Sequence, residues 1–396
     1  MRIYWSLIAL FIFIATATFM IVAAHRQDHH GDFGTYRAAA RALFETPTRS
    51  LYDAAPGYVY PPFLALALRP LDLLPEPWPG LLWDVGRWCC FGVALVLCYR
   101  RVVQAVTPRA ALLIVAICFV GSLRPIWRDT VNGNVNAYLL AALVGGWWLL
   151  AAERAGRAGL VWSLLPAIKP GSAAVLLAPV IKRGRGIGRC WVAALAGVLL
   201  TNVLMLLIFL GPEATRVQLS AFPCGAADTP DHVYSRYGNH SLALSTARIA
   251  QRLAGDDIDV VSPVALQTAR IGTGVAAGLW IVGLLWRVRR SGGPTAIDSA
   301  VSVLGIVSTL LSPVVWVTHY LLLVPAYATL ARTAAVSKHA GVQTCALATV
   351  GFALVQIVCN APLLNTMVWS PLALLVGLTV ATLAEADRAP ADPSHQ

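Results

Sequence analysis

Residues 191–210 decide the fold class: they have the sequence WVAALAGVLLTNVLMLLIFL and contain no charged side chain. A helix of about twenty apolar residues spans roughly 30 Å, which matches the hydrocarbon thickness of a bilayer. Membrane-spanning strands would instead show segments of about ten residues in which apolar and polar side chains alternate. The continuous apolar run therefore predicts a transmembrane helix, and a helical protein rather than a β-barrel.

The rest of the chain has the same apolar character. Of its 396 residues, 58% are hydrophobic and only 12% are charged, whereas about a quarter of the residues in a soluble domain are charged. This composition excludes a soluble enzyme. The net charge of +11 comes from short basic clusters between apolar runs, so it indicates membrane topology and not nucleic-acid binding.

Basic clusters favour the cytoplasmic side of a membrane, so they fix the direction of each predicted crossing. The clearest clusters are Arg100-Arg101, Arg154 with Arg157, Lys182-Arg183 and Arg289-Arg290. Full crossings are then predicted at residues 3–24, 80–99, 109–123, 135–152, 190–210, 264–286, 297–312, 319–333, 341–359 and 368–384. The expected fold is an all-α transmembrane bundle of about ten crossings, with both termini in the cytoplasm.

The bundle is expected to form one domain over residues 1–385, followed by a short cytoplasmic tail at 386–396. The first apolar stretch has no convincing cleavage site, so it is predicted to be a retained helix rather than a signal peptide.

Two apolar stretches do not fit this topology as simple crossings. Residues 61–75 are too short to span the bilayer comfortably, so an interfacial or re-entrant helix is predicted. Residues 158–181 lie between two basic clusters and are interrupted at Lys169-Pro170, which predicts a broken hairpin of half-helices. Non-helical backbone at that depth requires protein or a wet cavity around it.

The same topology places two long polar segments, 25–60 and 211–263, on the extracytoplasmic face of the cell membrane. Shorter outer loops are expected near 124–134 and 313–318, and an amphipathic helix on the membrane surface is expected after residue 241. A transporter usually carries polar groups near the midplane, often in inverted repeats. Here the polar side chains concentrate on one face, which favours an enzyme that works at the outer surface.

Asp32 is the candidate catalytic residue of the first outer segment. A carboxylate beside the membrane can act as a general base towards an acceptor hydroxyl, while the start of a short helix also suits an N-cap; both interpretations stay open. Most other outer acids, among them Asp84 and Asp129, have the pattern of turn or cap residues. Residues 28–30, Asp-His-His, are adjacent and rarely would converge on one ion, so no metal and no other cofactor is predicted.

Four cationic side chains are candidates for binding a phosphate. Arg124 and Arg128 precede an apolar helix, where guanidinium groups and a helix N-terminus both suit phosphate; a solvated basic loop is the other interpretation. Lys169 lies in the interrupted hairpin, where an intramembrane lysine suggests function, although a snorkelling lysine would look the same. His319 lies in an outer turn and can shuttle a proton near neutral pH.

Seven polar or aromatic side chains are candidates for lining a substrate cavity. Tyrosine and tryptophan are also ordinary residues of the membrane interface, so structure alone explains the aromatic ones about as well as function does. The candidates are Tyr36, Tyr60, Asn134, Asn136, Asn239, His240 and Trp316.

Taken in order, these motifs resemble glycosyltransferase family 87, a family of membrane-embedded enzymes of the GT-C class. The motifs are Asp32-x-x-x-Tyr36, Leu51-Tyr52-Asp53, Tyr60-Pro61-Pro62, Gly133-Asn134-x-Asn136, Lys169-Pro170, Gly238-Asn239-His240-Ser241 and Ser312-Pro313-x-x-Trp316-x-x-His319. The resemblance runs from about residue 30 to residue 325. The chain departs from the commoner family pattern at Asn134, where glutamine is frequent, and at Thr318, where a second histidine is frequent.

The resemblance implies a polyprenyl-phosphate sugar as donor, transfer outside the cytoplasm, and Asp32 as the catalytic base of an inverting displacement. It further implies a glycolipid or polysaccharide acceptor, with the isoprenoid tail lying among membrane lipids in a lateral groove. Mannose is the first expectation for the sugar, because the family includes polyprenol-phosphate-mannose-dependent mannosyltransferases. An arabinofuranosyltransferase and a lipid-linked sugar flippase or transporter stay open as alternatives, as does the oligomeric state.

Overall fold

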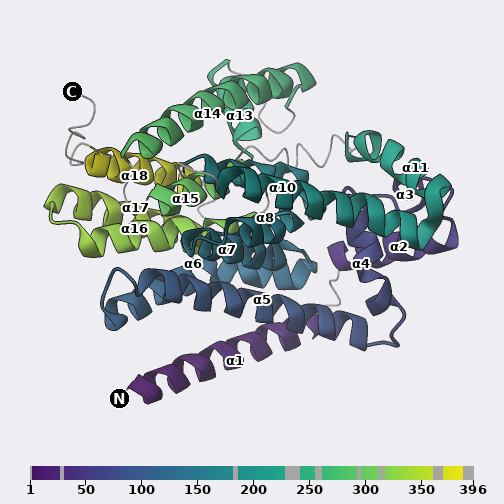
Figure 1. Ribbon diagram of the computed structural model, residues 1–396, viewed down its shortest axis with the longest axis horizontal. Coiled ribbons are helices and arrows are strands. Elements are labelled where there is room, and N and C mark those ends of the chain that lie inside the picture. Colours follow the sequence, from purple (N-terminus) through teal and green to yellow (C-terminus); the bar gives the residue numbers. More distant parts are fainter. Residues whose placement is uncertain are drawn as a thin grey trace.

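The architecture comes from a computed structural model, which describes residues 2–26, 31–181, 186–227, 241–254, 261–291, 296–310, 315, 317–359 and 369–386. Every regular element in these residues is helical, as Figure 1 shows. The protein is therefore an all-α, multi-pass membrane protein, as the sequence predicts.

The helical elements follow one another with short connections. They are α1 (Arg2–Arg26), α2 (Gly31–Glu45), α3 (Leu51–Ala54), α4 (Pro62–Asp72), α5 (Trp78–Val102), α6 (Pro108–Asn132), α7 (Asn136–Ala151), α8 (Ala155–Trp162), α9 (Leu164–Ile168), η1 (Pro170–Ile181), α10 (Gly186–Leu199), η2 (Leu200–Leu204), α11 (Met205–Ala227), α13 (Leu242–Ala254), α14 (Pro263–Ser291), α15 (Ala296–Leu310), η3 (Val317–Leu323), α16 (Val324–Val336), α17 (Ala340–Cys359) and α18 (Trp369–Ala386). Of these, η1 and η3 are 3₁₀ helices and η2 is a π-helical turn. Each of the ten predicted crossings coincides with a helix or with consecutive helical segments.

Five helices in the described part of the chain are both long and apolar enough to cross a membrane. They are α1, α5, α6, the continuous α10–α11 helix and α14. Shorter helical apolar stretches of 10–17 residues pack beside them, within α7, α15, α17 and α18 among others. Because a helix of that length spans the hydrocarbon only in part, the number of full crossings stays a prediction.

The long α10–α11 helix changes direction at Gly211. This residue has φ 80° and ψ 172°, a conformation that glycine adopts without steric cost. The following Pro212 also removes a helical hydrogen bond, and such positions are where helices kink. The kink lies where the sequence predicts the second long polar segment to begin.

The short helices α2, α3 and α4 gather with the second half of α11 at one end of the molecule, on the right of Figure 1. Along α2, apolar side chains recur every three or four residues and are buried, which gives one face that packs on α4. Gln218 on α11 fixes this end: its amide donates to the carbonyls of Pro47 (2.9 Å) and Arg49 (2.7 Å) and accepts from the Leu51 amide (2.9 Å).

The two apolar stretches that do not fit as crossings are short helices. Pro61 and Pro62 open α4, because proline fixes a helical φ and lacks the donor that a first turn leaves unpaired. The second stretch is broken at Lys169, whose φ of −138° and ψ of 96° are extended and separate α9 from η1. Both features agree with the predictions from the sequence.

One predicted loop is wrong. Residues 124–132 were expected to lie in an outer loop, but they form the last turns of α6, which ends only at Gly133. Pro125 lies inside the helix and does not terminate it, because a proline removes one hydrogen bond while the flanking turns keep theirs. The connection to α7 is therefore a tight turn and not a loop of eleven residues.

Candidate active site

The candidate site is built on this tight turn between α6 and α7. Gly133 has φ 72°, a left-handed conformation that favours glycine. A Cβ atom at this position would lie 2.5 Å from Cβ of Phe33, so only glycine lets the turn approach the start of α2. Trp83 on α5 contacts both the turn and the start of α2. Its Nε1 donates to the Gly133 carbonyl (2.9 Å), and its ring stacks on Phe33 with centroids 5.3 Å apart.

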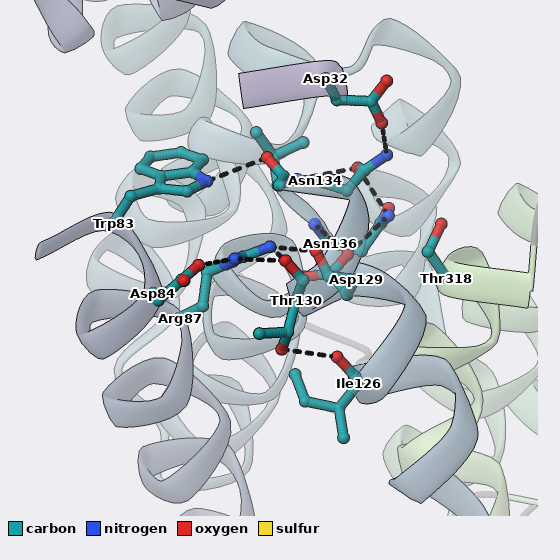
Figure 2. Close-up of polar contacts among 12 residues, drawn as sticks. Asp32, Trp83, Asp84, Arg87, Ile126, Asp129, Thr130, Asn134, Asn136 and Thr318 are labelled. Atoms are coloured by element: carbon teal, nitrogen blue, oxygen red, sulfur yellow. Dashed lines mark hydrogen bonds and ion pairs between the residues drawn. The ribbon is translucent and has the colours of Figure 1, made fainter. Parts of the chain in front are cut away.

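The close approach brings Asp32 and Asn134 together across 102 residues of sequence. Nδ2 of Asn134 donates to Oδ2 of Asp32 over 2.5 Å, and Figure 2 shows the carboxylate facing the turn. Burial raises the pKa of the Asp32 carboxyl above its ordinary value, and the Asn134 hydrogen bond and the charges of Lys169 and Arg87 oppose that rise. A raised pKa makes the carboxylate a stronger base.

Asn136 and Asp129 extend the hydrogen bonds inward from Asn134. Nδ2 of Asn136 donates to Oδ1 of Asn134 (2.8 Å) and to Oδ1 of Asp129 (3.2 Å). The backbone N–H of Asn136 also donates to Oδ1 of Asp129 (3.3 Å). The sequence predicts a turn or cap role for Asp129 in an outer loop; instead its side chain is wholly buried in the last turn of α6.

Arg87 on α5 pairs with this acid, and the sequence analysis missed it. Its guanidinium donates to the carbonyls of Asp129 and Thr130 and to the carboxylate of Asp84, and one nitrogen lies 3.9 Å from Oδ2 of Asp129. Nε2 of His25 lies 3.2 Å from the other oxygen of Asp84. Asp84 is thus not a turn residue, because it is buried inside α5. The i, i+3 spacing of Asp84 and Arg87 places both on one helix face and was the available signal.

Two of the predicted cavity residues, Tyr36 and Tyr60, lie beside Asp32. Their rings meet edge to face with centroids 5.2 Å apart, and Tyr36 is 2% exposed. Burial raises the pKa of both phenols, and the negative charge of Asp32 adds to the rise. Both hydroxyls therefore stay protonated next to the carboxylate.

The four cationic side chains predicted to bind phosphate differ in their burial and in the helices that carry them. Lys169 is half-buried at the break between α9 and η1, and its charge acts on Asp32 and Asp129. His319 is 5% exposed in η3, which packs against α6 and α7. On α6, Arg124 is half-buried and Arg128 is exposed. Successive helical residues are rotated by about 100° around the axis, so Arg128 lies on a different face of α6 from the buried Asp129.

Residues 58–313 match the sequence profile of glycosyltransferase family 87, which is more than half of the chain. The protein belongs to this family. No curated protein and no solved structure matches it.

The family match is narrower than the resemblance predicted from the motifs. It includes Tyr60, Asn134, Asn136 and Lys169, and it leaves out Asp32. Tyr36, Trp316 and His319 also lie outside it. Asp32 is nevertheless joined to this glycosyltransferase region by its hydrogen bond to Asn134.

Several predicted residues lie outside the part of the chain that the structure describes. They are Asn239, His240 and Trp316, together with residues 28–30. Within the described residues, no three His, Cys, Asp or Glu side chains gather closely enough to hold a metal ion. The candidate site therefore consists of the Asp32–Asn134 contact, the hydrogen bonds of Asn136 and Asp129 beneath it, the two tyrosines and Lys169.

Proposed function

We propose that this protein moves a sugar, mannose in the first instance, from a polyprenyl-phosphate donor to a lipid or polysaccharide acceptor on the extracytoplasmic face. The observation that carries the proposal is the Asp32 carboxylate held by Asn134, in a member of glycosyltransferase family 87. Asn134 occupies one carboxylate oxygen, Oδ2, so the other oxygen is available to an acceptor hydroxyl.

The reaction is a single displacement with inversion. Asp32 takes the proton of the acceptor hydroxyl while the hydroxyl oxygen forms a bond to the anomeric carbon. The bond between that carbon and the phosphate oxygen breaks, and its electron pair leaves with the polyprenyl phosphate. The phosphodiester thus becomes a phosphate monoester, and negative charge develops on the leaving group.

Cationic side chains stabilise that developing charge. Lys169 is the best supported of them, because its charge already acts on Asp32 and it lies at the break in an otherwise apolar hairpin. Arg124, Arg128 and His319 are further candidates. The charge of Lys169 also opposes the rise in the Asp32 pKa that burial causes.

The test is sugar transfer by the purified protein in lipid vesicles. Synthetic polyprenyl-phosphate-mannose and its arabinose analogue are each offered with a glycolipid acceptor mixture. We expect turnover of the mannose donor, and Asp32→Asn should lower it by about 10²–10⁴-fold, the usual contribution of a general base. Asp53→Asn is the matched control, because Asp53 is an exposed acid on neighbouring α3 and loses the same charge.

Each outcome separates the alternatives. Turnover of the arabinose analogue alone would replace mannose with arabinofuranose and leave the chemistry unchanged. Movement of labelled donor across the bilayer that survives Asp32→Asn, without any transfer, would overturn the proposal in favour of a flippase. Equal loss of transfer in Asp32→Asn and Asp53→Asn would remove Asp32 as the base.

A further inference from the structure

We infer that Asp129 is a positioning residue: through Asn136 and Asn134 it fixes the direction of the hydrogen bonds that end at Asp32, and so holds Asp32 as a hydrogen-bond acceptor. This inference rests on the proposed function, because it concerns how the base is kept ready for the acceptor hydroxyl. Asp129 does not touch the substrate in this scheme.

The direction is first set at Asn134. An amide side chain has one accepting oxygen and one donating nitrogen, so it can face a partner in either of two orientations. Oδ1 of Asn134 accepts from the backbone N–H of Val135 (2.8 Å) and from Nδ2 of Asn136 (2.8 Å). Two donors on the oxygen leave the nitrogen facing Asp32.

Asn136 is oriented in turn by Asp129. The Asn136 nitrogen contacts two acceptors, Oδ1 of Asn134 and Oδ1 of Asp129. An ionised carboxylate can only accept, so Asp129 does not tolerate the reversed amide, which would bring an oxygen against its own. From Asp129 to Asp32 the hydrogen bonds therefore have one direction, as Figure 2 shows. The Asn136 nitrogen donates both to Asp129 and to the Asn134 oxygen, and the Asn134 nitrogen donates to Asp32.

Arg87 favours the ionised form of Asp129, which this direction of the hydrogen bonds requires. A guanidinium stays protonated in proteins, and its nitrogen lies 3.9 Å from Oδ2 of Asp129 in a wholly buried setting. Asp84 on the other side of Arg87 also pairs with that cation. Asp84 has the same charge and burial as Asp129 but makes no contact with either amide.

The groups that act electrostatically on Asp32 are Lys169, Arg87 and the phenols of Tyr36 and Tyr60. The charge of Asp129 acts on all four of these groups, so Asp129→Asn changes charge as well as the direction of the hydrogen bonds. Asn136→Ala leaves every charge in place and therefore separates the two effects.

With a neutral amide at position 129, Asn136 is no longer required to point its nitrogen at a carboxylate, so it can reverse and stop donating to Oδ1 of Asn134. The Val135 N–H then holds that oxygen alone, and the Asn134 hydrogen bond that opposes the rise in the Asp32 pKa becomes weaker. Asp32 is then protonated more readily and acts less well as a base.

The experiment compares Asp129→Asn with Asp84→Asn in the vesicle transfer assay. For Asp129→Asn we expect kcat to fall by about 10²-fold, as for other misplaced catalytic groups, with the donor KM within about threefold of the wild type. The pH midpoint of kcat should also move to higher pH, because protonated Asp32 is favoured. Asp129→Glu keeps an accepting carboxylate and should recover most of the lost kcat. Asp84→Asn should keep kcat within about threefold.

A second variant covers the case in which Asp129→Asn does not fold. Asn136→Ala interrupts the chain of amides and leaves the ion pair between Arg87 and Asp129 intact, so it should lose kcat to the same extent as Asp129→Asn. Thermal unfolding in detergent identifies the folded variants.

Three results would overturn the inference. A folded Asp129→Asn or Asn136→Ala variant with wild-type kcat and pH midpoint would show that the direction of the hydrogen bonds does not matter. Equal losses in Asp84→Asn and Asp129→Asn would assign the effect to charge around Arg87. Absence of transfer by the folded wild type would instead overturn the proposed function, and the inference with it.

Discussion

Two buried aspartates, Asp298 and Asp129, differ in how completely they are paired. Oδ1 of Asp298 on α15 accepts from Arg101 (2.9 Å) and Trp147 (2.8 Å), and Oδ2 accepts from Arg101 (2.9 Å) and Arg332. Both oxygens are therefore filled by donors from three other helices. Such an acid joins α5, α7, α15 and α16.

Asp129 is equally buried, but its second oxygen is not filled. Oδ2 of Asp129 makes no hydrogen bond in the described part of the chain, and only the longer ion pair to Arg87 faces it. Its other oxygen is connected through two amides to the half-buried Asp32. Burial of a charge therefore does not by itself mark a site. A site is marked by incomplete pairing together with a route to a more exposed group.

The largest expected effect is on Asp298. Asp298→Ala leaves Arg101 and Arg332 without their carboxylate, and removing one partner from a buried ion pair costs about 3–5 kcal/mol. Thermal and denaturant unfolding in detergent should show this loss, while transfer per folded molecule stays near that of the wild type. Ser302→Ala is the control, because Ser302 bonds Thr329 nearby (2.9 Å) and its loss costs only about 1 kcal/mol. Unchanged stability of Asp298→Ala would contradict the structural role that we assign to Asp298.

The next effect concerns the turn that carries Asn134. Gly133→Ala combines a positive φ with a Cβ that meets Phe33 at 2.5 Å, and we expect a loss of about 2–3 kcal/mol of stability together with most of the transfer activity. Gly57 also has a positive φ, 88°, but a Cβ there meets nothing within 4 Å. Gly57→Ala should therefore cost about 1 kcal/mol and keep activity. Equal effects at the two glycines would show that the close approach to α2 is unimportant.

A smaller effect is expected on the stability of the site itself. The pKa of Asp32 is raised in the fold by burial, so the folded protein binds a proton more readily there than the unfolded chain. Its carboxyl therefore favours folding only at low pH, and this contribution is lost as pH rises through the raised pKa. Asp32→Asn should be at least as stable as the wild type at pH 7.5, and the advantage should shrink towards pH 5. Unfolding curves across this range test the sign; a variant less stable at pH 7.5 would contradict it.

The sequence predicted the helices and the exceptions among them well. Each apolar run became a helix, because the bilayer requires internally satisfied backbone groups and leaves few alternatives. The break at Lys169 and the start of α4 at Pro61-Pro62 followed from local rules for proline. The end of α6 was not predicted, although a glycine in the left-handed conformation, here Gly133, is a local signal for the end of a helix. The close approach of this turn to Phe33 is a contact that no local pattern shows.

The candidate site was predicted only in part. Asp32 and Asn134 were both named, but as members of separate loops, and their contact depends on the close approach of α2 to the α6–α7 turn. Asp84, Arg87 and Asp129 were missed as a group. A single sequence shows that a charged residue lies in an apolar helix, but its partner on another helix is fixed by packing, which the sequence does not display.

The smallest effect is expected for the partners of a third aspartate, Asp72 on α4, whose own side chain is 2% exposed. It is surrounded by Arg37 (3.1 Å), Arg41 (2.9 Å) and Arg69 (3.2 Å). The Arg41 side chain is 51% exposed, and exposed ion pairs contribute about 0–1 kcal/mol. Arg41→Gln should therefore lower stability by less than about 1 kcal/mol, with no change in transfer.

Arg37→Gln is the matched variant, because this side chain is only 16% exposed and also binds Glu76 (2.5 Å). It should cost more than Arg41→Gln in the same unfolding measurement, since it loses two acid partners in a less solvated place. If the two variants lose the same amount of stability, the exposure of the arginine does not determine how much each ion pair contributes. The contrast between Asp298 and Asp129 would then have to rest on the number of donors around each acid, and not on how far each pair is removed from water.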